Sequence, residues 1–145
     1  MLAQPNGDLK DPKTGRNYYC LFWETAGKPL LSSWTQGSVV KGAETAEFLE
    51  KSLAQLGLNE REANEFIIYW LPQMENNPFN AIYFATDEYE KTSQLDIQPR
   101  PDQIIRVMMV WKPLQSPIPL QPQILPKMPA RKGFVVVEWG GVKEE

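Results

Sequence analysis

Three charged side chains lie in or beside apolar runs that are typical of β-strands, and together they form the arrangement in this chain that could do chemistry. Glu24 ends an aromatic run, Arg106 interrupts an apolar run, and Glu138 lies inside the last apolar run. If the strands are neighbours, the guanidinium of Arg106 meets two carboxylates. A hydrolase with two carboxylates needs one of them protonated near neutral pH, as the acid, and the other ionised, as the base.

The alternative is a structural ion-pair network that ties the strands together, and we favour it. An adjacent guanidinium holds a carboxylate in its ionised form, and an ionised pair has no proton to donate to a leaving group. We therefore predict that Arg106 pairs with a carboxylate, with Glu138 as the first choice and Glu24 as the second. A hydrolase that uses Glu24 and Glu138 stays the alternative.

Other residue types narrow the possible chemistry further. The chain contains no histidine and one cysteine, Cys20. These counts remove the commonest general base and metal ligand, and they exclude an intramolecular disulfide and a cysteine-based zinc site. Cys20 lies inside the run Tyr-Tyr-Cys-Leu-Phe-Trp, so we expect a small core residue and not a nucleophile. The sequence indicates no catalytic residue, no metal ligand and no cofactor.

Aromatic side chains offer a second kind of site, a surface that binds a carbohydrate or a protein partner. Four tryptophans lie on expected strands or helices, where large aromatics usually build the core; they are Trp23, Trp70, Trp111 and Trp139. Trp34 lies on an expected loop and is the best exposed candidate. The candidates for a binding site are therefore Trp34 and the charged group of Glu24, Arg106 and Glu138.

The bulk composition argues for one domain and against two classes of partner. The chain has 145 residues, of which 42% are hydrophobic, and we expect a single domain over residues 1–145. The net charge is −3, and no cluster of basic residues is present, which disfavours nucleic acid as a partner. No apolar run is long enough for a transmembrane segment, and no signal peptide is recognisable in this chain.

The elements that must position these side chains include a helical hairpin at residues 43–56 and 60–71. Gly57 is a helix stop, and Asn59 followed by Glu62 is a capping pair. The short link makes the two helices antiparallel neighbours. Each helix carries an apolar stripe at helical spacing, formed by Ala46, Leu49, Leu53 and Leu56 in the first and by Ala63, Phe66, Ile67 and Trp70 in the second.

Alternating and apolar runs predict strands, which are expected at residues 18–24, 79–86, 104–112 and 134–139, the last one closed by Gly140-Gly141. The run 104–112 is apolar on both faces, which is typical of a central strand. Residues 25–42 indicate a short strand or a packed loop, and residues 87–103 indicate mostly loop.

Six prolines between residues 113 and 129 predict an extended arm that lies over the surface of the domain. Its stretch Ser116-Pro-Ile-Pro-Leu has the character of a segment that docks into an aromatic groove of another protein, although a strap over the sheet is the interpretation that we favour. The order of elements predicts the α+β class: a mainly antiparallel sheet with an αα-hairpin packed on one face and a proline-rich extended arm.

Four stretches are similar, in order, to a family of uncharacterised, mostly bacterial conserved proteins. They are the block GLxxREAxEFIxYWLPxM at 57–74, the block GFxxVEWGG at 133–141, and residues 18–24 and 101–113. Many members look secreted or surface-attached, and the family implies no established activity, cofactor or catalytic residue. Members usually carry a Lys-Pro-Val-Ile-Tyr-Leu-Tyr-Pro-like signature and further strands upstream. This chain has no such signature, so we expect it to lack the N-terminal strands of the full family domain.

These observations favour a non-enzymatic binding or structural module of a surface or secreted protein. Two alternatives remain. One is the two-carboxylate hydrolase described above, and the other is a small subunit of a larger assembly that uses the proline-rich arm as its contact.

Overall fold

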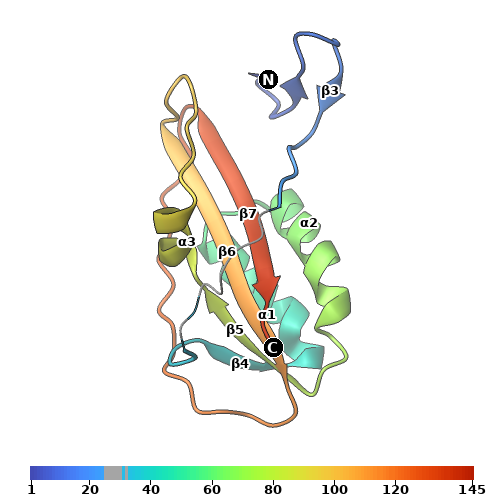
Figure 1. Ribbon diagram of the computed structural model, residues 1–145, viewed down its shortest axis with the longest axis vertical. Helices are drawn as coiled ribbons and strands as arrows, with labels where there is room; N and C mark the ends of the chain where they lie inside the picture. Colours follow the sequence, from blue (N-terminus) through green and yellow to red (C-terminus); the bar gives the residue numbers. More distant parts are fainter. Residues whose placement is uncertain (25–30, 32) are drawn as a thin grey trace.

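The computed structural model describes residues 1–24, 31 and 33–145. Among these residues, a four-stranded sheet and three α-helices form the main body, and a small three-stranded sheet at the N-terminus lies apart from it (Figure 1). This is the α+β class that the order of elements predicts. Residues 25–30 and 32, which belong to the stretch with an ambiguous pattern, lie outside the described residues.

The main sheet consists of β4 (Ser38–Lys41), β5 (Phe79–Phe84), β6 (Gln103–Leu114) and β7 (Val135–Lys143), side by side in that order. β4 with β5 and β5 with β6 are antiparallel, whereas β6 and β7 are parallel. The sheet is therefore mainly antiparallel, and the run predicted to be a central strand, now β6, is paired on both sides. The register of β6 and β7 sets Arg106 opposite Glu138.

The last strand is longer than the sequence suggests. Gly140 and Gly141 do not close β7, which continues to Lys143. The reason is packing: a Cβ atom on Gly141 would lie 2.8 Å from a ring atom of Trp70 and 3.0 Å from the carbonyl oxygen of Met109. The glycine therefore lets the indole ring approach the strand, and it does not act as a strand stop.

The helical hairpin is present where the sequence predicts it. α1 (Thr45–Gln55) follows the 3₁₀ turn η1 (Gly42–Glu44), and α2 (Glu60–Trp70) leads into the 3₁₀ turn η2 (Leu71–Gln73). The side chain of Asn59 accepts the backbone N–H of Glu62 at 2.9 Å, and the carboxylate of Glu62 accepts the backbone N–H of Asn59 at 2.9 Å, which completes the predicted capping box. In the described part of the chain, no helix combines the length and apolar character that crossing a bilayer requires.

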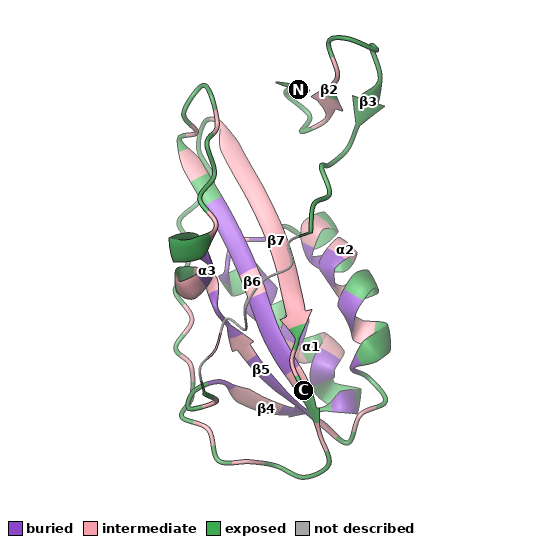
Figure 2. Cartoon of the chain, in the orientation of Figure 1, coloured by how far each residue is buried: buried purple, intermediate pink, exposed green. Residues whose placement is uncertain are grey.

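The core lies between the hairpin and one face of the sheet, where Figure 2 shows the buried side of both helices. The predicted stripes point into it, except that Ala46 and Ile67 are only half-buried. From the sheet come alternate residues of β6, since side chains two apart share a face. The core members from both layers include Leu49, Leu53, Phe66, Trp70, Ile105, Val107, Met109 and Trp111.

The opposite face of the sheet carries a helix that the sequence pattern does not predict. Residues 86–92 form α3 (Thr86–Thr92), which begins at the last residue of the strand predicted at 79–86 and continues into the stretch 87–103 that is expected to be mostly loop. Its seven residues are strongly polar, so the pattern lacks an apolar stripe, and a single large side chain, Tyr89, is buried against the sheet. Packing of that ring and side-chain hydrogen bonds, such as the one from the Tyr83 hydroxyl to Glu88 at 3.0 Å, hold α3 in place.

The proline-rich arm connects β6 to β7, because parallel neighbours require a crossover connection. It first follows the open edge of the sheet, where the backbone N–H of Gln121 donates to the carbonyl oxygen of Thr35 at 3.0 Å. The side-chain amide of Gln123 then donates to the carbonyl of Phe84 at 2.8 Å and accepts its N–H at 2.9 Å. β4 pairs with β5 only as far as Ile82, and Gln123 binds the backbone of β5 beyond that point. The arm therefore acts as a strap over the sheet, as we expected.

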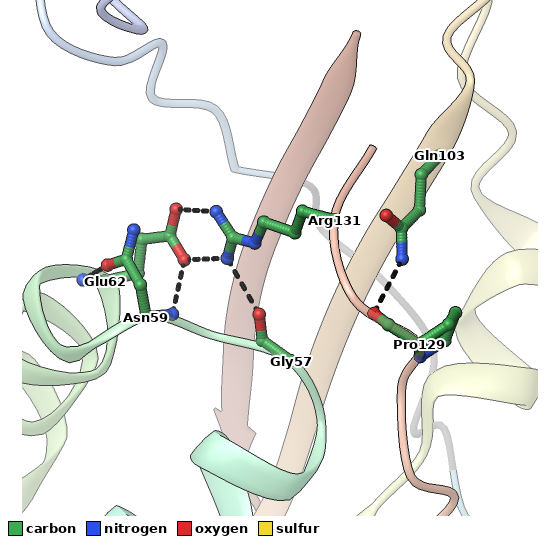
Figure 3. A network of polar contacts seen from close by, with 6 residues as sticks. All are labelled: Gly57, Asn59, Glu62, Gln103, Pro129 and Arg131. Carbon is green, nitrogen blue, oxygen red and sulfur yellow. Dashed lines mark hydrogen bonds and ion pairs between the residues drawn. The ribbon is translucent and has the colours of Figure 1, made fainter. Parts of the chain in front are cut away.

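The arm then reaches the turn of the helical hairpin, where Arg131 fastens it (Figure 3). The guanidinium donates to both carboxylate oxygens of Glu62 and, at 2.7 Å, to the carbonyl oxygen of Gly57. Burial acts to raise the pKa of Glu62, but Arg131 and the backbone of Asn59 outweigh it, and the pKa is lowered. The pKa of Arg131 is raised by its bond to Glu62.

Candidate functional site

Among the described residues, four exposed apolar side chains lie close together in residues 18–22, called here the aromatic segment. The prediction of a strand at 18–24 is wrong, because only Asn17–Tyr18 forms a strand, β3, which pairs with β2 (Leu9–Lys10) in the small N-terminal sheet together with β1 (Leu2–Ala3). Tyr19 lies in a bend, and residues 20–24 belong to no strand. The exposed fraction is 62% for Leu21 and 76% for Phe22, and Tyr18 and Tyr19 are exposed as well.

Two expectations for this segment are therefore wrong. Cys20 is not a core residue, since its thiol is free and exposed. Trp23 is about half exposed and does not belong to the core. The physical reason is that an apolar run makes a core strand only if the sheet offers it an edge, and these residues pair with no strand of the main sheet.

The segment is anchored at its C-terminal end by a cluster on the α3 face of the sheet. The rings of Trp23 and Tyr89 are stacked, with centroids 6.3 Å apart and planes inclined by 20°. Beneath them, the guanidinium carbon of Arg106 lies 4.5 Å from the centroid of the Tyr89 ring. The Tyr89 hydroxyl donates to Oε1 of Glu138 at 3.1 Å. One side chain of α3 thus links the aromatic run to the charged pair in the sheet.

Arg106 and Glu138 form the predicted ion pair, and the prediction is confirmed. Nε of Arg106 lies 2.5 Å from Oε2 of Glu138, and the exposed fractions of the two side chains are 6% and 15%. Nη1 of Arg106 donates to the carbonyl oxygen of Ser93 at 2.6 Å. Burial and the carboxylate of Glu138 raise the pKa of Tyr89, so that its hydroxyl stays protonated as a donor. Each charge of this buried pair needs the other, because either charge alone is expensive to bury.

Glu24 does not complete the two-carboxylate arrangement. It is exposed, and among the described residues it takes part in no hydrogen bond or ion pair. Glu138 has one carboxylate oxygen bound by Arg106 and the other by Tyr89. This arrangement ties β6, β7 and α3 together, and it offers no carboxylate pair around an open space.

Trp34 is not the exposed side chain that its loop position suggests. It is half-buried, and its Nε1 donates to Oε2 of Glu144 at 3.0 Å. The ammonium of Lys112 lies 5.1 Å from its ring centroid. Trp34 therefore holds the C-terminal end of the chain against the sheet, a role that no local pattern announces.

The remaining tryptophans behave as core residues. Trp70 and Trp111 are buried, and Trp139 is half-buried and packs against the core. Beside Trp139, the neighbouring helix leaves a second apolar patch open, because Ile68 and Tyr69 of α2 are both exposed. The rings of Tyr69 and Trp139 lie 6.4 Å apart, which places Tyr69 next to β7.

A cavity of about 400 Å³ lies between α1, β5 and the arm. Its apolar floor includes Phe48, Phe84 and Leu125, and its polar groups are the side chains of neighbouring serines, glutamines and Lys51. The ammonium of Lys51 is already paired with Glu47 at 2.5 Å. Within the described residues, no group of three or more histidine, cysteine, aspartate or glutamate side chains is placed to hold a metal ion.

Comparison of the chain with protein-family models, with curated proteins and with solved structures finds no match. Sequence reasoning missed Tyr89 and the exposed aromatic segment. The polar composition of α3 gives no signal that Tyr89 is buried. The exposure of the aromatic segment depends on which edges of the sheet are available, and this cannot be read from the segment itself.

Proposed function

We propose that the protein is a non-enzymatic binding module and that the aromatic segment is its binding element. The observation that supports this is the exposure of Tyr18, Tyr19, Leu21 and Phe22 in one short stretch. Single exposed apolar side chains are ordinary, but a contiguous set marks an interaction surface. Fully burying one such side chain stabilises a protein by about 1.5–3 kcal/mol relative to leaving it exposed. A partner that covers these side chains would therefore gain binding free energy from their burial.

The segment is also held in place. Trp23 stacks on Tyr89, and Tyr89 is fixed by Arg106 and Glu138 beneath it. At the other end, the guanidinium carbon of Arg61 lies 6.0 Å from the Tyr19 ring centroid. Anchoring both ends lowers the conformational entropy that binding must remove, which favours affinity.

The chemistry of the segment favours a protein partner over a carbohydrate. Leu21 and Phe22 are its most prominent side chains, and neither offers a hydrogen-bond donor or acceptor to a sugar hydroxyl. Aromatic and aliphatic side chains together are typical of the centre of protein interfaces. We therefore expect the ligand to be an apolar surface of another protein.

Capture of partners from an extract of the native source tests this function. We expect the protein to retain a partner, and the double variant Leu21→Ser with Phe22→Ser to lose it. Ile124→Ser is the matched control, because Ile124 is 93% exposed on the arm, away from the segment. Equal capture by the wild type and the double variant, with both folded, would contradict the proposal, and so would Phe22-dependent binding to glycans and to no protein.

A hydrolase screen tests the enzymatic alternative. Because both oxygens of Glu138 are engaged by Arg106 and Tyr89, we expect no turnover of glycoside or ester substrates that depends on Glu24 or Glu138. The control is the circular dichroism spectrum of each variant. Activity in the wild type that disappears in both Glu24→Gln and Glu138→Gln, with folding intact, would favour the enzyme.

A further inference from the structure

The cavity between α1, β5 and the arm has walls that side-chain amides hold in place. At one wall, the amide of Gln123 accepts the backbone N–H of Phe84 at 2.9 Å and donates to its carbonyl oxygen at 2.8 Å. At the other, the amide of Gln55 donates to the carbonyl oxygen of Leu125 at 2.7 Å. These bonds fix the arm relative to the strand and the helix, so the space of about 400 Å³ between them is preformed. Its volume lies within the range of about 300–1,000 Å³ that is usual for small-molecule sites.

Most of the floor of this cavity is apolar. Ile82 and Phe84 of β5 are almost completely buried, and both lie on the helix side of the sheet, since residues two apart share a face. Phe48 of α1 and Leu125 of the arm are partly buried and pack against the same core. The apolar body of a ligand would therefore meet aromatic and aliphatic side chains from the strand, the helix and the arm.

One buried polar group of the lining lacks a partner among the described residues. Ser52 of α1 is only 6% exposed, and in the part of the chain that the structure describes its hydroxyl takes part in no hydrogen bond. Buried polar groups are nearly always hydrogen-bonded, because burial without a partner costs free energy. Since Ser52 lines the cavity, a polar group of a bound molecule would supply the bond.

Of the described residues that line the cavity, Lys51 alone is charged. Its ammonium lies 2.5 Å from Oε1 of Glu47, which is outside the lining, and the two side chains are 75% and 70% exposed. An ion pair as exposed as this contributes little to stability. Lys51 directly precedes Ser52, and its long stem lets the ammonium turn towards a group that is bound at the Ser52 hydroxyl. The lining therefore favours a negatively charged head group.

We propose that this cavity is a second binding site, separate from the aromatic segment, and that it takes a small amphipathic carboxylate. The apolar body lies against Ile82, Phe84 and Leu125, and the carboxylate accepts hydrogen bonds from the Ser52 hydroxyl and the Lys51 ammonium. Hydrogen bonds to an ionised group are roughly twice as strong as those between neutral groups. The site therefore prefers an acid to the alcohol of the same chain length.

Titration of the full chain with octanoate tests this site, with calorimetry for the affinity and the amide shifts in NMR spectra for the location. We expect saturable binding of one octanoate per chain, with the largest shifts at Ser52, Phe84 and Leu125. Octanol should bind about tenfold more weakly, because it lacks the charge. Absence of saturable octanoate binding, or equally tight binding of octanol, would overturn the proposal.

Three variants of α1 sharpen the result. Ser52→Ala and Lys51→Gln should each weaken octanoate binding by about five- to tenfold, since each removes a donor to the carboxylate. Glu47→Gln should instead strengthen it by about two- to fivefold, because it releases Lys51 from its partner. Glu50→Gln, on the exposed side of the same helix, is the matched control and should leave binding unchanged. If the pair of Lys51 and Glu47 had only a structural role, Lys51→Gln and Glu47→Gln would change binding alike, and that result contradicts the site.

The aromatic segment is another place where an apolar probe could adhere, and the two sites are separable. The double variant Leu21→Ser with Phe22→Ser should bind octanoate as the wild type does, because neither residue lines the cavity. Octanoate binding that is lost in this variant and kept in Ser52→Ala would overturn the cavity site. Circular dichroism and thermal unfolding verify that each variant is folded.

Discussion

At the scale of single residues, the best-defined feature is the buried pair of Arg106 and Glu138 with Tyr89 above it. The guanidinium makes three described contacts, to a carboxylate, a carbonyl oxygen and the face of an aromatic ring. Each partner comes from a different part of the chain, so the pair joins the two parallel strands to α3. The pair also supports the ring of Tyr89, on which Trp23 stacks at the end of the aromatic segment.

Removal of one charge from this pair should be costly. We expect Glu138→Ala to lower the free energy of unfolding by about 3–5 kcal/mol, because it leaves a nearly buried guanidinium without its carboxylate. Urea unfolding followed by circular dichroism gives the value. Glu24→Ala, at an exposed position without a described partner, should change it by less than about 0.5 kcal/mol. Similar losses in both variants would show that the pair is not what holds Arg106.

At the scale of elements, the helical hairpin supplies most of one layer of the core. Leu53 in α1 is completely buried beneath the sheet. We expect Leu53→Ala to cost about 2–5 kcal/mol in unfolding experiments, the usual range when a buried leucine leaves a cavity. Glu50→Ala, on the exposed side of the same helix, is the control and should have little effect. A loss below about 0.5 kcal/mol for Leu53→Ala would place this face of α1 in solvent.

The strap is fastened to the hairpin by Glu62 and Arg131, and this contact depends on pH. Since the pKa of Glu62 in the folded protein lies below its ordinary value of 4.5, the ionised carboxylate stabilises the fold above about pH 4.5. That stabilisation is lost as the pH falls from there through the lowered pKa, because protonation then weakens the pair. Thermal unfolding between pH 3 and 7 should show a smaller pH dependence for Glu62→Gln than for the wild type. Glu60→Gln, exposed on the same helix turn, should retain the wild-type dependence.

At the scale of the whole molecule, the arm determines the topology. It must carry the chain from the end of β6 back to the start of β7, because these strands are parallel. On its way it covers the edge of β5 with Gln123 and reaches the hairpin turn with Arg131. One edge of the sheet is thereby protected. At the other edge, β7 pairs with β6 alone among the described residues.

The sequence by itself determined the elements whose signals are local. The hairpin, its capping box and the central strand β6 follow from helical spacing, from Asn59 and Glu62, and from a run that is apolar on both faces. The pair of Arg106 and Glu138 was also predictable, since a charge inside an apolar strand requires a partner. In each case the physical cause is either a pattern within a few residues or the need of a buried charge for a partner.

The tertiary structure alone decided which apolar residues are buried and which side chains meet. Residues 18–22 have the composition of a core strand, yet the sheet provides them no partner within the described chain, so Cys20 and Phe22 are exposed. Tyr89 and Trp34 acquire their roles from Glu138 and Glu144, 49 and 110 residues away in the sequence. Gly141 lies inside β7 and not at its end, and the absence of a side chain leaves room for the ring of Trp70. Burial and pairing depend on where distant segments arrive, and local periodicity carries no information about that position.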